Sequence, residues 1–286
     1  MWKNIDISSK EIITKYTKGL FEICDYNFVN LLTWSEGDNI QYKIENDILY
    51  MKGNYLGESS YFFPISLNSC EEDINIAIEK ILEEGYSVEL IPEEWKDKLE
   101  DKYYFEEQRP TFDYIYLMEE IAFLKGRKYI KKRNKINQFI KNNIFKYEEI
   151  DKNNIELVKE FQESWMLEKE GYSIDELKKE NIGIKTILEN YFELNLCGGA
   201  IFVNNKIIAY TIGEKIKNQL FVYVEKADES YSGSYQAINA FFLQENKEEI
   251  LTVNREDDAG LDGLRQAKES YFPYKLLKKY RIISKK

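Results

Sequence analysis

Residues 253–273 constrain the fold more than any other segment, because a strand, a turn and a helix follow one another directly there. The segment, VNREDDAGLDGLRQAKESYFP, has four charged residues in a row after its β-type start, and Gly260 and Gly263 then provide the turn. At 100° per residue the helix gathers its apolar side chains on one face. These are Leu261, Leu264, Ala267, Tyr271 and Phe272. Arg265 and Lys268 fall among them, so the pattern predicts two cations on the side that faces the core.

The two inward cations need anionic partners, since an unpaired buried charge is very costly. The acidic run just upstream, Glu256, Asp257 and Asp258, can supply part of that charge. A substrate carboxylate, a phosphate or a developing oxyanion can supply the rest. The helix alone leaves an internal ion-pair network and a ligand site equally open.

Two segments resemble the soluble C-terminal domain of bacterial phosphatidylglycerol lysyltransferases. The family's closing motif has Gly-Leu-Arg, then Lys three residues later, an aromatic residue, Pro and a basic-Tyr pair. Its counterparts here are Gly263, Leu264, Arg265, Lys268, Tyr271, Pro273, Lys279 and Tyr280. GRKYIKKRNKIN at 126–137 resembles the segment that links the family's two halves, and its Arg is Arg133. NREDD at 254–258 is closer to a stand-alone, functionally uncharacterised branch than to the lysyltransferases proper.

The order of predicted elements indicates an α/β (α+β) fold with antiparallel hairpins that turn at 46–47 and 204–205. The resemblance implies more: two tandem acyltransferase domains of the N-acetyltransferase (GNAT) type, each a mixed, largely antiparallel sheet flanked by helices. We expect a degenerate first copy at 1–150 that ends in a basic helix. The second copy, at 151–286, carries NREDD and the GLRxxKxxYxP motif.

Composition excludes several kinds of chemistry. Histidine is absent, which removes Ser-His and Cys-His nucleophile pairs and the commonest zinc ligand, and no metal site is expected. Cys24, Cys70 and Cys197 lie far apart without CxxC spacing, as in a reduced cytosolic protein. No apolar run reaches the ~20 residues of a membrane span, and the N-terminus lacks the pattern of a signal peptide. The sequence therefore predicts a cytoplasmic location.

Charge is distributed unevenly along the chain. The net charge of −11 argues against general nucleic-acid binding by the whole molecule, yet residues 125–135 hold seven Lys or Arg residues and no acid. Four lysines share one face of the helix predicted there, either as a solvated face or as a contact with the acceptor stem of tRNA. These tRNA-binding candidates are Lys128, Lys131, Lys132 and Lys135. Arg133 turns toward the core, where we expect an internal phosphate or carboxylate partner.

The resemblance places the segment 225–239, EKADESYSGSYQAIN, where acetyl-CoA-dependent members of the implied fold bind the pyrophosphate. It has one glycine, Gly233, and no Arg, and it carries Asp228 and Glu229, which would repel a diphosphate. Acetyl-CoA is therefore disfavoured, and no cofactor is expected.

The resemblance implies an aminoacyltransferase that takes an aminoacyl group from aminoacyl-tRNA and delivers it to an amine or hydroxyl of a lipid headgroup, a peptide or a small molecule. Such a transfer needs aligned reactants, a stabilised oxyanion and a proton acceptor. The catalytic candidates are Arg265 and Lys268 for the oxyanion and Glu256, Asp257 and Asp258 for the proton. The substrate-binding candidates are Asn254, Arg255, Glu225, Lys226, Tyr235, Asn239, Tyr271 and Arg133. For Tyr235 and Asn239, a packing role in the core is the alternative.

Two other functions are compatible with the sequence. One is an acyl-CoA-dependent N-acyltransferase, which stabilisation by acetyl-CoA would favour. The other is a non-catalytic ligand-binding member of the same fold, which a fully active, folded Lys268→Ala variant would favour. The donor amino acid, the acceptor and the oligomeric state are left open.

Overall fold

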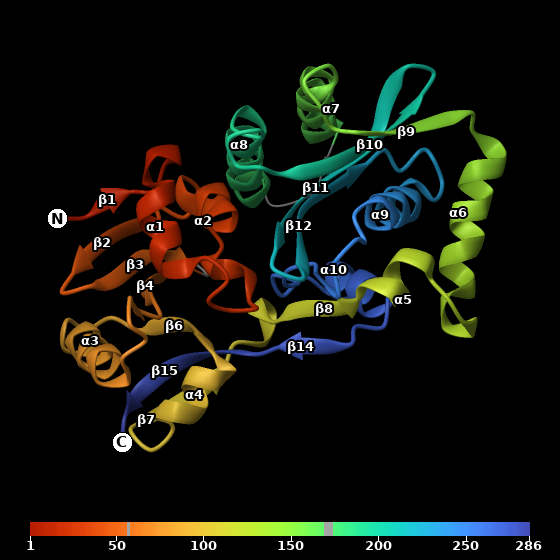
Figure 1. The fold of residues 1–286 in the computed structure, drawn as a ribbon. Coiled ribbons are helices and arrows are strands. Elements are labelled where there is room, and N and C mark those ends of the chain that lie inside the picture. The colour runs from red at the N-terminus through yellow and green to blue at the C-terminus, as the bar shows by residue number, and fades with distance from the viewer. Residues whose placement is uncertain (56–57, 169–173) are drawn as a thin grey trace.

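The computed structural model describes residues 1–55, 58–168 and 174–286, which form two sheets flanked by helices (Figure 1). The first sheet contains most of the N-terminal strands and also the last strand of the chain. Its strands are hydrogen-bonded in the order β1 (Lys3–Asn4), β2 (Gln41–Glu45), β3 (Ile48–Tyr55), β4 (Glu58–Phe62), β6 (Val88–Pro92), β15 (Lys279–Lys285) and β7 (Tyr103–Glu107), with β5 (Ile65–Ser66) beside β3.

The second sheet is built mainly from the C-terminal half of the chain. Its strands follow the order β14 (Lys275–Leu277), β8 (Asp113–Leu117), β13 (Thr252–Asn254), β12 (Gln219–Ala227), β11 (Lys206–Ile216), β10 (Cys197–Val203) and β9 (Phe145–Glu149). β12 and β13 run parallel here, as do β4 and β6 in the first sheet, while the other described pairs are antiparallel. Both sheets are therefore mixed and largely antiparallel, and the expected fold class is confirmed.

The division between the two sheets does not fall at residue 150. β8 and β9 precede that residue but belong to the second sheet, whereas β15 lies between β6 and β7 of the first. The physical reason is packing, because Tyr280 and Ile282 of β15 complete the core of the first sheet. We call residues 1–112 with 279–286 the first unit and residues 113–278 the second unit.

Helices cover both faces of the second sheet. On one face, α5 (Met118–Phe123), α6 (Ile130–Asn142) and α9 (Ser234–Glu245) pack through residues such as Ile121, Phe139 and Phe242. On the other face lie α7 (Ile155–Glu168) and α8 (Ile174–Glu189), whose apolar side chains join the core of the first unit. The first unit contributes α1 (Lys10–Thr17), α2 (Phe28–Ser35), α3 (Glu71–Glu83) and α4 (Glu93–Leu99). Short 3-10 turns lie at η1 (Ile7–Ser9), η2 (Cys24–Tyr26), η3 (Arg109–Thr111) and η4 (Arg127–Tyr129).

The two units share one packed interface. In α8, a Cβ on Gly183 would lie 1.9 Å from the carbonyl oxygen of Thr33 in α2, so a glycine is required for the helices to approach so closely. One core cluster contains residues of both units, among them Leu32 and Ile184. The side chains that the second unit places at this interface are therefore within reach of the first.

The motif helix α10 (Asp262–Glu269) turns its two cations toward the protein. Lys268 is buried and Arg265 is half-buried, which confirms the predicted direction of these cations. Leu264 is 39% exposed and Phe272 is 45% exposed, so the expected apolar face does not face the core. The reason is that α10 packs on the polar loop 254–258 and not on an apolar surface.

Candidate functional site

The candidate site begins where β12 and β13 part. Their parallel pairing ends at Asn254. The chain beyond it follows β8 instead: the N–H of Arg255 donates to the carbonyl oxygen of Tyr114, and the N–H of Tyr114 donates to that of Glu256, both at 3.1 Å. The loop 254–258 therefore leaves the sheet at an opening between strands, a place where α/β proteins commonly bind ligands.

Asp258 anchors the end of this loop through two guanidinium groups. Arg265 binds it through Nε at 2.9 Å and Nη2 at 3.0 Å, and Nη1 of Arg109 donates to it at 3.0 Å. Burial acts to raise the pKa of Asp258, but hydrogen bonds from Arg265 and Tyr114 lower it to about 2. Such a carboxylate is a poor proton acceptor, and it neutralises the charge of Arg265. The geometry of both residues fits a positioning role.

Lys268 holds the same loop from the inside. Its Nζ donates to the carbonyl oxygens of Arg255, at 2.5 Å, and of Asp257, which flank Glu256. Burial lowers the pKa of Lys268, while the nearby carboxylates of Asp257 and Glu256 oppose that shift. The ammonium group thus fixes the backbone on both sides of Glu256.

Glu256 carries the carboxyl group best suited to exchange a proton. Its backbone has a φ of +56°, in the left-handed region that residues other than glycine rarely adopt. Asn30, on α2 of the first unit, donates from Nδ2 to Oε1 of Glu256 at 2.9 Å. Burial, assisted by repulsion from Asp257 and opposed by Lys268, raises the pKa of Glu256 to about 8. A group with this pKa both accepts and releases protons near neutral pH.

Arg255 bridges the two strands that part. Its Nη2 donates to Oε1 of Glu225, on β12, at 2.9 Å, and its guanidinium lies 5.1 Å from the ring centre of Tyr271. Asn239, on α9, donates from Nδ2 to the other oxygen of Glu225 at 3.0 Å. Four predicted substrate-binding residues are therefore brought together at this point.

Lys132 joins this cluster and does not lie on a fully solvated face. Its Nζ donates to the hydroxyl of Ser270 at 2.6 Å and lies 4.0 Å from the ring centre of Tyr271. Burial, together with repulsion from Arg255 and Lys135, lowers the pKa of Lys132 to about 8. It is the member of the basic helix that the fold turns toward the candidate site.

The three other predicted tRNA-binding lysines are exposed. Lys128 forms an exposed ion pair with Glu120 at 2.6 Å. Such a pair provides little stability, and the carboxylate of Glu120 offsets the positive charge of Lys128. Lys131 and Lys135 extend from α6. The exposed basic face therefore consists mainly of these two side chains and the basic side chains of η4, the turn that precedes α6.

Three predicted substrate-binding residues lie apart from the Arg255 cluster. Arg133 donates from Nη1 to backbone carbonyl oxygens of the turn before α6, including that of Gly126 at 2.7 Å. The turn therefore holds Nη1 of Arg133, and a phosphate or carboxylate partner for the rest of the guanidinium stays a prediction. Lys226 pairs with Glu180 of α8 at 2.6 Å. Tyr235 interacts with the backbone at the end of β12.

Sequence reasoning missed the buried charges that tie the loop to the first unit. Nζ of Lys279, at the start of β15, donates to Oδ1 of Asp113 at 2.6 Å and pairs with Asp25. Asn254 donates to Oδ2 of Asp113 at 2.7 Å. Cys24, Asp25 and Asp113 bring three possible metal-ligand atoms within 4.8 Å of one another. The ammonium group of Lys279 already pairs with both carboxylates, which offsets the charge that would attract a cation.

Local sequence patterns gave little indication of the residues that bind loop 254–258. Lys279 belongs to the C-terminal motif on which the family resemblance rests, so its importance was detectable from that match. Asn30, Arg109 and Asp113 come from distant parts of the chain, and only the fold brings them to loop 254–258.

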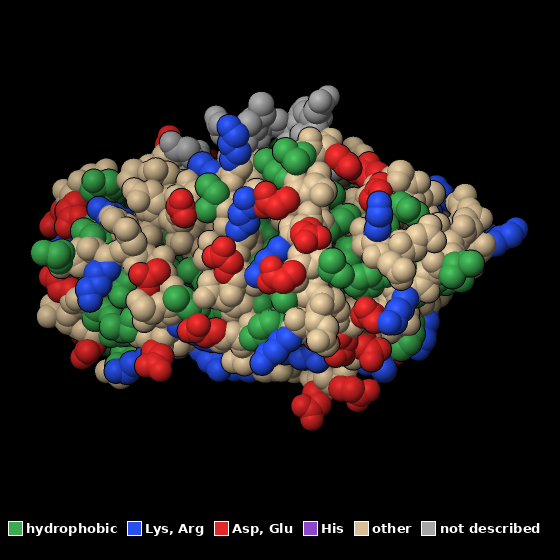
Figure 2. Space-filling view, turned by 90° about the horizontal axis from the view of Figure 1, so that it is seen from above, with side chains coloured by type: hydrophobic (Ala, Val, Ile, Leu, Met, Phe, Trp, Pro, Cys, Tyr) green, Lys and Arg blue, Asp and Glu red, His purple; other side chains and the backbone are tan. Residues whose placement is uncertain are grey.

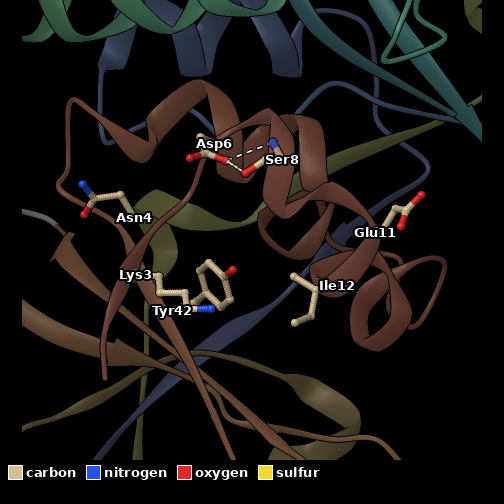
Figure 3. Close-up of a pocket in the computed structure, with 7 residues that line it drawn as sticks. All are labelled: Lys3, Asn4, Asp6, Ser8, Glu11, Ile12 and Tyr42. Carbon is tan, nitrogen blue, oxygen red and sulfur yellow. Dashed lines mark hydrogen bonds between the residues drawn. The ribbon is translucent and has the colours of Figure 1, made fainter.

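Two surface hollows lie elsewhere and include none of the predicted site residues. One, of about 590 Å³, lies beside β1 and β2, where Asp6 accepts hydrogen bonds from Ser8 (Figure 3). The other lies near the start of α7 and is rich in acidic side chains. On the face shown in Figure 2, acidic and basic side chains are interspersed.

The two mixed sheets and their helices form a two-unit fold of the GNAT-like type. The chain belongs to the family described as "Phosphatidylglycerol lysyltransferase, C-terminal", which matches residues 20–283. An uncharacterized protein of Mycoplasmoides gallisepticum is 27% identical over 179 residues. That match covers 59% of this chain and 55% of the relative, so this chain spans little more than half the relative's length.

Solved structures agree with this membership. A conserved protein of unknown function from Bacteroides thetaiotaomicron superposes with a TM-score of 0.85 at 31% identity, covering 98% of each chain. L-PGS from Bacillus licheniformis has a TM-score of 0.66 at 14% identity, covering 98% of this chain and 92% of its own. FemX has a TM-score of 0.55 at 8% identity, covering 98% and 96%. At such identities the last two similarities establish the shared fold.

Of the helices within 1–55, 58–168 and 174–286, none combines the length and apolar character needed to cross a bilayer.

Proposed function

We propose that this protein transfers an aminoacyl group from aminoacyl-tRNA to an amine or hydroxyl acceptor. The observation that carries the proposal is the carboxyl group of Glu256, which has a pKa of about 8 and a left-handed backbone at the opening between β12 and β13. Membership of the lysyltransferase family supports the aminoacyl class of the group transferred. The acceptor belongs to one of three classes: a lipid headgroup, a peptide or a small molecule.

Glu256 fits the proton transfers that such a reaction requires. The acceptor nitrogen or oxygen attacks the carbonyl carbon of the donor ester, and its proton passes to the Glu256 carboxylate. The ester C–O bond then breaks, and the ribose oxygen that leaves takes the proton back from Glu256. The donor ester is already activated, so the protein needs to align the reactants, stabilise the oxyanion and handle a single proton.

Arg265 and Lys268 then act as positioning residues. Arg265 holds Asp258 at one end of the loop, and Lys268 holds the carbonyl oxygens that flank Glu256. Both actions keep the Glu256 carboxyl in place without contact to the reacting atoms. This division of roles supports Glu256 over Asp258 as the proton acceptor, because the pKa of Asp258 is about 2.

The start of α9 supports a donor other than acyl-CoA. Gly233 has a φ of +90°, and a Cβ there would lie 2.3 Å from the carbonyl oxygen of Lys135 in α6. α6 therefore packs against the helix start where an acyl-CoA would place its pyrophosphate. Asp228 and Glu229 precede this point and would also repel a diphosphate.

The test is a transfer assay with tRNA charged with a pool of radiolabelled amino acids. Phospholipid vesicles, peptides and polyamines are offered in turn, and label is followed into each. We expect transfer to one class, and a loss of about 10²–10⁴ in rate for a folded Glu256→Gln variant. Glu248→Gln is the matched control, because the side chain of Glu248 is 84% exposed. Full activity of Glu256→Gln would eliminate its assigned role, and stabilisation by acetyl-CoA without label transfer would favour the acyl-CoA alternative.

A further inference from the structure

The hydrogen bond that joins Asn30 to Glu256 leaves one acceptor oxygen open on each partner. Asn30 donates from Nδ2 to Oε1 of Glu256 at 2.9 Å, so its own Oδ1 and the second carboxyl oxygen, Oε2, take no part in that bond. Neither oxygen accepts a hydrogen bond from any residue within 1–55, 58–168 and 174–286. Both side chains are half-buried, so a ligand can approach the two open oxygens.

The charges around the Glu256 carboxyl favour the approach of a cation. Asp257 beside it and Asp113 on β8 both repel negative charge at this point. The Lys268 ammonium on α10 attracts the carboxyl through space, but its hydrogen bonds go to backbone carbonyl oxygens. Among the described residues, therefore, no cation pairs directly with this carboxyl group. Two uncharged groups also face it, and burial raises the pKa of each well above its usual range: Tyr223 on β12 and Cys24 in η2.

We infer that the acceptor is a primary amine, which binds between Asn30 and Glu256. One N–H group of the amine donates to Oε2 of Glu256, and the other donates to Oδ1 of Asn30. Because these two bonds hold both hydrogens, they also direct the nitrogen lone pair that attacks the ester carbonyl carbon. A hydroxyl has a single hydrogen and leaves one of the two oxygens without a donor. The inference rests on the proposed function for the attack, but binding of an amine can be measured without transfer.

The proton transfers balance in this arrangement. The amine reaches the site as an ammonium ion and releases one proton to solvent, because only the neutral amine has a lone pair for attack. As the nitrogen bonds to the carbonyl carbon, the proton on its Glu256 side passes to Oε2. The ester C–O bond then breaks, and the ribose oxygen that leaves takes this proton. The amide product keeps its remaining N–H on Oδ1 of Asn30, so a residue of the first unit determines the choice of acceptor.

Titration of the full chain with butylamine tests the binding step. Glutamate labelled with ¹³C at its carboxyl carbon reports on Glu256 by NMR, and the signal that Glu256→Gln lacks identifies this group. Butylamine should shift the signal, whereas 1-butanol at the same concentration should not. N,N-Dimethylbutylamine carries the same charge but a single N–H as its ammonium ion. It should bind roughly tenfold more weakly than butylamine, because Oδ1 of Asn30 is left without a donor.

Variants of Asn30 separate recognition of the amine from a merely structural role. Asn30→Leu keeps the approximate size of the side chain, and Asn30→Ala removes the same amide without adding apolar bulk. Both should bind butylamine roughly tenfold more weakly, and the difference between butylamine and its dimethyl derivative should disappear. Asn142→Leu, at the exposed end of α6, is the matched control and should preserve that difference.

The transfer assay with charged tRNA then tests the choice of acceptor on one molecule. In trans-4-aminocyclohexanol the amine and the hydroxyl compete, and we expect the label in an amide, which survives mild alkali. Label in an alkali-labile ester would overturn the inference. So would the absence of a Glu256 shift with butylamine, or a preference for butylamine over its dimethyl derivative that persists in both Asn30 variants. Amine binding that depends on Asn30, with no transfer of label to any acceptor, would refute the proposed function and leave the amine site standing.

Discussion

The buried ammonium of Lys279 should control stability more than any other single charge in this protein. Its side chain is 0% exposed, and its partners Asp113 and Asp25 are 0% and 9% exposed. Lys279→Met keeps the length of the side chain and removes the charge, so two buried carboxyl groups lose their common partner. Asp113 also accepts from Asn254, which places the disturbance at the start of loop 254–258.

The magnitude follows from the burial of the pair. Removing one partner of a buried ion pair costs about 3–5 kcal/mol, because the remaining charge is left in a poorly solvated site. For a chain of this size each kcal/mol lowers the Tm by roughly 2–4 °C, so we expect a decrease of roughly 6–20 °C. Thermal unfolding followed by circular dichroism, together with urea unfolding, measures both quantities.

The adjacent residue provides the control. Lys278 pairs with Glu107 at 2.6 Å, but the two side chains are 40% and 50% exposed, so Lys278→Met should leave the Tm almost unchanged. Burial raises the pKa of Asp25 to about 6, while Lys279 opposes that rise. Without Lys279 the pKa rises further, and the folded variant binds a proton that the unfolded chain does not. The stability deficit should therefore shrink from pH 7.5 to pH 5. Equal Tm values for the two variants, or a deficit that grows on acidification, would refute the reasoning.

Three further results are expected. Asp258→Asn should lower the free energy of unfolding by about 1–2 kcal/mol, because partly exposed cations lose a common anion. The pKa of Asp258 is about 2, so the stability advantage of the wild type should be present above pH 4. In acid titrations this advantage should disappear as the pH falls toward 2. Gly183→Ala should destabilise by about 1–3 kcal/mol in urea unfolding, whereas Gly263→Ala, with open space around it, should be neutral or slightly stabilising. The initial rate of transfer should rise with pH to a plateau above about 8 as Glu256 ionises, and an inflection unchanged in Glu256→Gln would assign it to another group.

Features fixed by neighbouring residues were the ones that sequence could predict. The turns at 46–47 and 204–205 have positive φ values at all four residues, from 50° to 63°, as two-residue hairpin turns require. Helical periodicity placed Arg265 and Lys268 on one side of α10, where Lys268 is buried and Arg265 is half-buried. In each case the physical cause acts within one turn or one helix, so no distant partner had to be known.

Features that depend on distant partners were not predictable from local pattern. The placement of β15 between β6 and β7 depends on pairing across most of the chain, and no composition change near residue 112 marks the division. Leu264 is exposed because α10 packs on the polar loop 254–258, and helical periodicity does not specify the surface against which a helix packs. Lys132 was predicted on an exposed basic face, and it was the fold that brought Ser270 and Tyr271 to it.

The exchange of strands explains why loop 254–258 depends on both units. The first unit supplies Asn30 to the Glu256 carboxyl and Arg109 to Asp258, while β15 brings Lys279 to the carboxylate that also binds Asn254. The left-handed backbone at Glu256 is unfavourable by itself, and such a conformation persists only where its surroundings over-determine it. The contacts from both units provide that constraint, so the first unit forms part of the candidate site of the second.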